Sequence, residues 1–197
     1  MPRGSYLHID SIDGTPLAEE RFSCARGAQG WRYVAEVLDP SGGAAIGGID
    51  VTVDDAWRQL RVEVSAGSLV VRGGRSGGEM VWLRDTDEDS AAAYGFTGRS
   101  PAFLIVTARL LALAPGASTA IRLVDLTEPS LATFPVEQLW TLTEVTPYEA
   151  GPLSLPVERY EIVDRDSGQR RTLHLAGDVV LDAPGIELTD LDTPPTL

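Results

Sequence analysis

Residues 48–83 read GIDVTVDDAWRQLRVEVSAGSLVVRGGRSGGEMVWL, and this stretch decides the fold class of the chain. Apolar residues occupy every second position over residues 49–53, and they do so again over residues 60–64, beyond a corner that ends in Trp57. A period of two is typical of strands that bury one face, so the stretch predicts a half-buried antiparallel sheet.

The same pattern continues outward, because turn signals recur every 8–15 residues along the chain. We therefore expect an all-β or β-rich α+β fold, with a sandwich or barrel-like sheet. The apolar run at residues 102–113 is predicted to be a strand, residues 85–90 an acidic loop, and residues 147–156 the place for a turn of helix. Residues 1–190 are predicted to form a single β-rich domain, followed by a flexible tail at residues 191–197.

Charge narrows the function classes. All 16 basic residues are arginine, and 29 acidic residues leave a net charge of −13. Such a surface repels phosphate backbones and anionic lipids, so we expect no nucleic-acid partner and no stable membrane association. The apolar runs are shorter than the roughly 20 residues that a spanning helix needs. The N-terminal residues lack an apolar signal core, which predicts a cytoplasmic protein.

The sequence offers few groups for catalysis or metal binding. The single cysteine, Cys24, has neighbours that suit a buried structural residue. The two histidines are His8 and His174, and their spacing does not indicate a metal site. His8 and Asp10 share one face of a predicted strand, but no nucleophile motif accompanies them. We predict no catalytic residues, no metal and no cofactor.

Tryptophans and arginines remain as candidates for ligand binding. Each indole combines an apolar body with one N–H donor, and each guanidinium can bind an anionic or sugar head group. Spacing alone favours the interpretation that the tryptophans are ordinary core residues. The alternative is a cleft for an amphipathic ligand, and its candidate residues are Trp57, Trp82, Trp140, Arg99 and Arg109.

The run from residue 49 to residue 82 resembles the bacterial family of proposed glycolipid-binding proteins, in which an aspartate and a nearby tryptophan precede alternating arginine and valine. Here these positions are Asp54, Trp57 and the segment RQLRVEV at residues 58–64, with Trp82 as the second tryptophan. The segment ARLLALAPG at residues 108–116 resembles the family's arginine-leucine strand and closing glycine. The similarity spans about residues 17 to 190.

The resemblance implies a long, bent antiparallel sheet that forms an open half-barrel, similar to those of lipoprotein and lipid carriers. It also implies a ligand on the concave face, with Arg109 carried over as a head-group residue. The chain departs from the family at residues 96–99 and 103–106, where FTGR and FLIV replace the family's acidic and asparagine-containing segments. If those polar residues form the family's site, that site is altered in this chain.

The sequence is compatible with three functions. The first is a noncatalytic protein that binds an amphipathic or apolar small molecule, similar to a glycolipid or a fatty acid. The second is a structural or assembly protein that binds no small ligand, because its concave face is filled by its own side chains or by a symmetric partner. Edge strands of an unclosed sheet make a homodimer physically plausible. The third is an enzyme, which would need His8 or His174 beside a perturbed carboxylate in a deep pocket.

Overall fold

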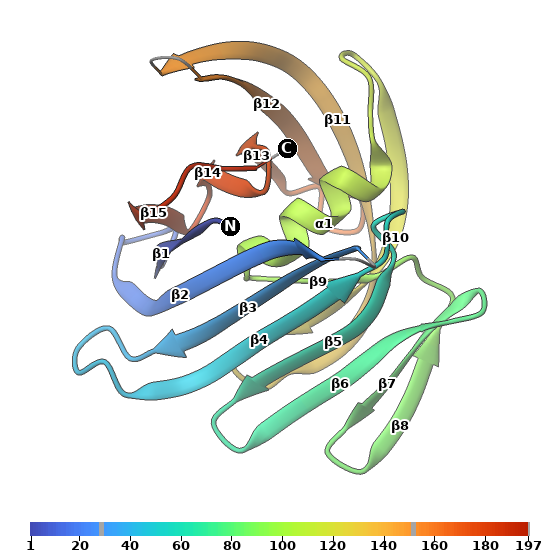
Figure 1. Ribbon diagram of the computed structural model, residues 1–197. Coiled ribbons are helices and arrows are strands. Elements are labelled where there is room, and N and C mark those ends of the chain that lie inside the picture. The colour runs from blue at the N-terminus through green and yellow to red at the C-terminus, as the bar shows by residue number, and fades with distance from the viewer. Residues whose placement is uncertain (28–29, 151–152, 197) are drawn as a thin grey trace.

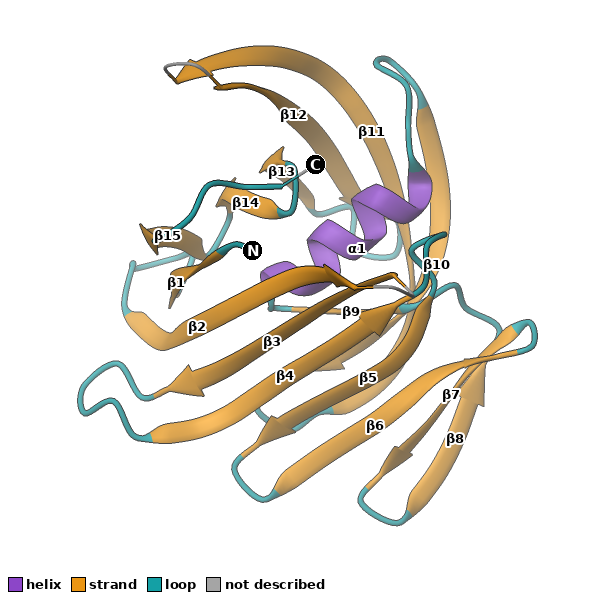
Figure 2. Ribbon diagram, viewed as in Figure 1, coloured by secondary structure: helices purple, strands orange, loops and turns teal. Residues whose placement is uncertain are grey.

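The computed structural model describes residues 1–27, 30–150 and 153–196. These residues form one open, mostly antiparallel sheet of 15 strands and one short α-helix (Figures 1 and 2). The sheet bends strongly around the helix (Figure 1). The predicted fold class, a nearly all-β chain with a long bent antiparallel sheet, is confirmed.

The sheet consists of two meanders that are joined where the ends of the chain meet. Its order is β8-β7-β6-β5-β4-β3-β2-β1-β15-β14-β13-β12-β11-β10-β9, and β9 is parallel to its neighbour β10. The elements are β1 (Arg3–Ile9), β2 (Pro16–Gly27), β3 (Gly30–Leu38), β4 (Ala45–Val53), β5 (Gln59–Ala66), β6 (Leu69–Ser76), β7 (Glu79–Arg84), β8 (Asp87–Ala91), β9 (Phe96–Gly98), α1 (Pro101–Leu111), β10 (Ser118–Thr127), β11 (Ala132–Ala150), β12 (Leu153–Asp164), β13 (Arg170–Ala176), β14 (Val179–Ala183) and β15 (Ile186–Leu191).

Residues 48–83 form the strands that their alternation predicts, with one shift of register. The alternating residues of β4 are buried, and Val51 pairs with Tyr33 of β3 on one side and with Val62 of β5 on the other. An irregularity in the β4–β5 pairing places Gln59, rather than Leu60, on the buried face. A bulge adds one residue and thereby changes the face of the side chains beyond it, so Leu60 is exposed.

The predicted strand over residues 102–113 is wrong, because this segment forms α1. Ser100 caps the helix by accepting a hydrogen bond from the Ala102 amide at 3.3 Å, and Pro101 follows in the first turn. Both are standard helix-start residues. Residues 101–108 are all buried, so the helix is apolar on every side and lacks the polar face that gives a helical period.

α1 occupies the concave side of the sheet (Figure 1). Its buried residues belong to the same core cluster as the inward side chains of strands from both meanders, including Val51, Trp82 and Trp140. The concave face is therefore packed with the protein's own side chains along α1, and cavities lie beyond the two ends of this helix.

Two further predictions of local structure are wrong. The predicted acidic loop at residues 85–90 contains most of β8, an exposed edge strand that pairs with β7. The predicted helical turn at residues 147–156 falls in the β11–β12 hairpin, where Pro147 pairs with Pro156; residues 151–152 of that segment lie outside the described residues. Near the C-terminus, Thr196 packs back onto Asp178 through two hydrogen bonds.

Candidate functional site

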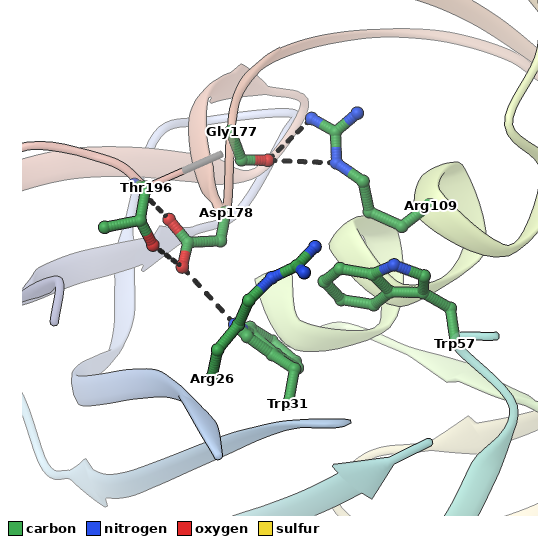
Figure 3. Close-up of a pocket in the computed structure, with 7 residues that line it drawn as sticks. All are labelled: Arg26, Trp31, Trp57, Arg109, Gly177, Asp178 and Thr196. Atoms are coloured by element: carbon green, nitrogen blue, oxygen red, sulfur yellow. Dashed lines mark hydrogen bonds between the residues drawn. The ribbon is translucent and has the colours of Figure 1, made fainter. Parts of the chain in front are cut away.

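A small hollow lies beside the last turn of α1 (Figure 3). Its volume is about 120 Å³. Side chains reach it from α1, from the β2–β3 hairpin, from the corner between β4 and β5, and from the turn between β13 and β14. The lining residues are Arg26, Trp31, Trp57, Arg109, Gly177, Asp178 and Thr196.

Trp57 lies at a strained corner that points its indole into the hollow (Figure 3). Its φ is 60°, in the left-handed region that non-glycine residues seldom adopt. Asp54 stabilises the corner, because its Oδ1 accepts hydrogen bonds from the amides of Ala56 at 3.0 Å and Arg58 at 2.9 Å. Asp54 thereby shapes the turn before Trp57. Strain of this kind is commonly retained where a side chain has a functional position.

Arg109 is fixed at the opposite wall of the hollow. Its Nε and Nη2 donate to the carbonyl oxygen of Gly177 at 3.1 and 2.6 Å, and its Nη1 donates to Glu158 Oε1 at 2.9 Å. The side chain is half-buried. The guanidinium is thus held in one orientation by the β13–β14 turn and by the Glu158 carboxylate of β12, which also offsets its charge.

Asp178 forms the floor of the hollow and is 4% exposed. Thr196 donates to this carboxylate from its amide and from its hydroxyl, each at 2.7 Å, and Trp31 Nε1 donates at 3.3 Å (Figure 3). A buried carboxylate needs several donors to offset the loss of water. The hydrogen bonds therefore join the C-terminal segment to β3 through Asp178.

Arg26 and Trp57 form the mouth of the hollow. The Arg26 guanidinium carbon lies 5.8 Å from the centre of the Trp57 ring, which is a cation–π distance. The Trp57 ring in turn lies 5.3 Å from the Trp31 ring. Among the described residues, the Arg26 guanidinium has no hydrogen-bond or ion-pair partner, so it can take an anionic ligand without losing one.

Cys24 is buried behind the hollow and is 1% exposed, which confirms the prediction of a buried cysteine. Burial raises the pKa of its thiol, and the neighbouring charge of Asp178 raises it further. Because the thiolate is the reactive form, we expect Cys24 to resist iodoacetamide in the native protein and to react fully in 6 M guanidinium chloride. Mass spectrometry of both samples measures this, and complete alkylation of the native protein would contradict the packing around Asp178.

The structure brings together two of the five residues that the sequence analysis proposed for ligand binding, Trp57 and Arg109. Trp82 and Trp140 belong to the core, with exposures of 3% and 0%. The Trp140 indole donates to Gln138 Oε1 at 3.0 Å, so its polar atom is satisfied inside the protein. Arg99 lines a separate cavity beyond the first turn of α1.

Sequence reasoning missed Arg26 and Asp178 at the hollow. Arg26 lies near the end of β2, and Asp178 lies in a turn between two short strands. Nothing in their local sequence links them, because they meet only through the pairing of the two meanders. The nearest signal is Trp31, which follows the hairpin and whose N–H needs a buried acceptor.

A second polar cluster is centred on Glu20, which is fully buried at the start of α1. Tyr33 and Ser100 donate their hydroxyls to Glu20 Oε1 at 2.6 and 2.7 Å, and His8 Nε2 lies 2.8 Å from Oε2. His8 therefore pairs with Glu20 and not with Asp10, the carboxylate that the sequence places on the same face of the strand. Its Nδ1 has no hydrogen-bond partner among the described residues. The positive end of a helix also favours a carboxylate at this position.

The described part of the chain contains no group of three or more His, Cys, Asp or Glu side chains that is arranged to hold a metal ion. Within the same residues, the structure has no helix with the length and apolar character required to cross a bilayer.

The chain forms an open, barrel-like sheet with a helix on its concave side, and two solved structures are similar to it in fold. A DUF1089 family protein from Pseudomonas aeruginosa is 18% identical, with a TM-score of 0.57 over 84% of this chain and 89% of that one. A β-barrel-like protein with a domain of unknown function, DUF1849, from Brucella abortus is 14% identical, with a TM-score of 0.57 over 97% and 96%. No protein-family model and no curated protein matches the sequence. At these identities the likeness concerns the fold alone.

Proposed function

We propose that the protein is a noncatalytic binding protein for a small amphipathic ligand, which it holds in the hollow beside the last turn of α1. The observation that carries this proposal is that one hollow is lined by two tryptophans and two arginines. These are Trp57, Trp31, Arg26 and Arg109. Two aromatic rings offer an apolar surface, and the Arg26 guanidinium offers charge-assisted hydrogen bonds to an anionic head, while Arg109, paired with Glu158, forms the opposite wall. The resemblance of residues 49–82 to proposed glycolipid-binding proteins supports the same class of ligand.

The size of the hollow limits what the ligand places there. A volume of about 120 Å³ is well below the roughly 300–1,000 Å³ of sites that enclose a whole drug-sized molecule. It fits an anionic head group and the first few carbons of a chain. The sequence analysis expects a ligand on the concave face, and we narrow this position to the hollow because α1 fills the face along its length.

The packing of the concave face along α1 agrees with the competing function, a homodimer without a small ligand, but the sheet edges give a homodimer less support. The edge strand β8 carries three consecutive acidic residues, Asp87, Glu88 and Asp89, and all are exposed. Pairing of two β8 edges would place like charges opposite each other, and charged edges are a known protection against self-association. The other edge strand, β9, has only three residues.

A titration of tryptophan fluorescence with alkyl carboxylates and alkyl sulfates of 6 to 16 carbons tests the proposal. Trp57 is the half-buried tryptophan of the four, so a ligand in the hollow is expected to shift its emission. Arg26→Gln should weaken binding about tenfold, as expected for loss of one charged contact. Arg61→Gln, which removes an equal charge from an exposed position on β5, serves as the matched control and should bind like the wild type.

The length of the ligand's alkyl chain provides a second test of the position of the site. Because the hollow is small, affinity should stop rising after the first few carbons. A continued gain of about 0.8 kcal/mol for each added methylene up to 16 carbons would show a long acyl-chain site and would contradict the proposed position. Equal affinities of Arg26→Gln and Arg61→Gln would contradict the role of Arg26. Absence of any saturable signal across both series would end the proposal.

A further inference from the structure

A second and larger cavity lies beyond the first turn of α1. Its volume is about 500 Å³, which is within the usual range for small-molecule sites. The turns at one end of the bent sheet converge on it, and it shares no lining residue with the first hollow. Its floor is apolar and comes from five elements, through Leu104, Leu126, Ile162, Leu173 and Ile186.

Arg171 lines this cavity and carries a charge that the protein leaves without a direct partner. Among the described residues, its guanidinium has no hydrogen bond and no ion pair within 4 Å. Burial lowers the pKa of Arg171, while the charges of Asp125 and Asp164 raise it. A half-buried cation without a hydrogen-bonded partner is costly, so an anion in the cavity would be favoured. The adjacent Arg170, by contrast, is exposed and pairs with Glu161.

Two carboxyl groups line the same cavity. Burial raises the pKa of both Asp125 and Glu128. Asp125 Oδ2 accepts a hydrogen bond from the Thr127 hydroxyl at 2.7 Å. Glu128 has no hydrogen-bond partner among the described residues, and nearby His8 and Arg99 only partly offset the rise of its pKa that burial causes. Carboxyl groups in this setting form hydrogen bonds with hydroxyl and amino groups of a ligand.

We infer that this cavity is a second binding site, for a small organic anion that also carries hydroxyl or amino groups. The anionic group binds Arg171, and the hydroxyl or amino groups bind Asp125 and Glu128 above the apolar floor. Hydroxy acids, amino acids and sugar phosphates have this combination of groups. The inference does not depend on the function proposed for the first hollow, because the two sites have different residues.

Protein labelled with ¹⁵N-arginine allows a direct test, with gluconate, glutamate and glycerol 3-phosphate as probes. The Nε–H signal of Arg171, assigned by its loss in Arg171→Met, is expected to shift saturably with at least one probe. Calorimetry should then show binding weakened about tenfold or more in Arg171→Met. Arg165→Met is the control, because Arg165 is exposed, pairs with Glu137 and does not line the cavity.

The thermal stability of Arg171→Met separates a binding residue from a structural one. Replacing a buried charge with an apolar group of similar size is often neutral or stabilising. We therefore expect the variant to melt at or above the wild-type temperature while losing the probe. Unchanged affinity in Arg171→Met, or no shift of the Arg171 signal with any of the three probes, would overturn the inference. Neither result bears on Trp57 fluorescence, so the two proposals fail separately.

Discussion

Glu20→Ala is expected to lower the free energy of unfolding by about 3–5 kcal/mol. The substitution leaves the hydroxyls of Tyr33 and Ser100 and the His8 ring without their common acceptor, and all three side chains are buried. It also removes a carboxylate from the start of α1, where the helix dipole favours one. Urea unfolding followed by circular dichroism at 25 °C measures the change.

Glu19→Ala provides the matched control for Glu20. The two residues are adjacent on β2, but Glu19 faces outward, so its loss should change stability by no more than about 0.5 kcal/mol. If Glu20→Ala does not fold, Glu20→Gln keeps the shape and part of the hydrogen bonding and should show a smaller loss. Similar stabilities of the Glu19→Ala and Glu20→Ala variants would contradict the description of the buried cluster.

Trp140→Ala is expected to destabilise the protein by about 3–5 kcal/mol, as is usual when a large core aromatic is truncated. Trp140 is 0% exposed, and the centre of its ring lies 5.8 Å from that of Tyr160 in an edge-to-face arrangement. The loss combines the transfer of a buried indole with the cavity that remains. Chemical unfolding at 25 °C measures it.

Ligand binding by conservative variants of Trp140 and Trp57 distinguishes a core tryptophan from one at the proposed site. Trp140→Phe keeps most of the apolar volume and should bind amphiphiles like the wild type, because Trp140 does not line the hollow. Trp57→Phe, at the mouth, should remove most of the fluorescence response with a smaller loss of stability. Weaker ligand binding by Trp140→Phe than by Trp57→Phe would place the site elsewhere.

The sequence was sufficient to predict strands and their buried faces where alternation is regular. Residues 49–53 show this, because their buried face follows from a period of two. The bulge that exposes Leu60 was not predictable, since it depends on how the corner at Trp57 joins β4 to β5. α1 was missed because a helix buried on every side carries no helical period, although Ser100 and Pro101 marked its start.

The candidate site was predicted only in part, because some of its residues meet through contacts between distant segments of the chain. Trp57 and Arg109 were chosen by residue type and by resemblance, and the structure places them in one hollow. Asp178 and Arg26 could not be paired with them, because the contact arises from the pairing of β1 with β15, which joins the two ends of the chain. The cavity at Arg171 depends on the same closure. Long-range pairing of this kind leaves no local signal in either segment.

Intermolecular nuclear Overhauser effects between the protein and the tightest-binding amphiphile are the most direct test of whether the hollow beside Arg109 binds the ligand. We expect contacts from the first methylene groups of the ligand to the indole protons of Trp57 and Trp31. Contacts instead to Leu104 and Leu173 of the second cavity, or no contact to Trp57, would contradict the proposal that the hollow beside Arg109 binds the amphiphile.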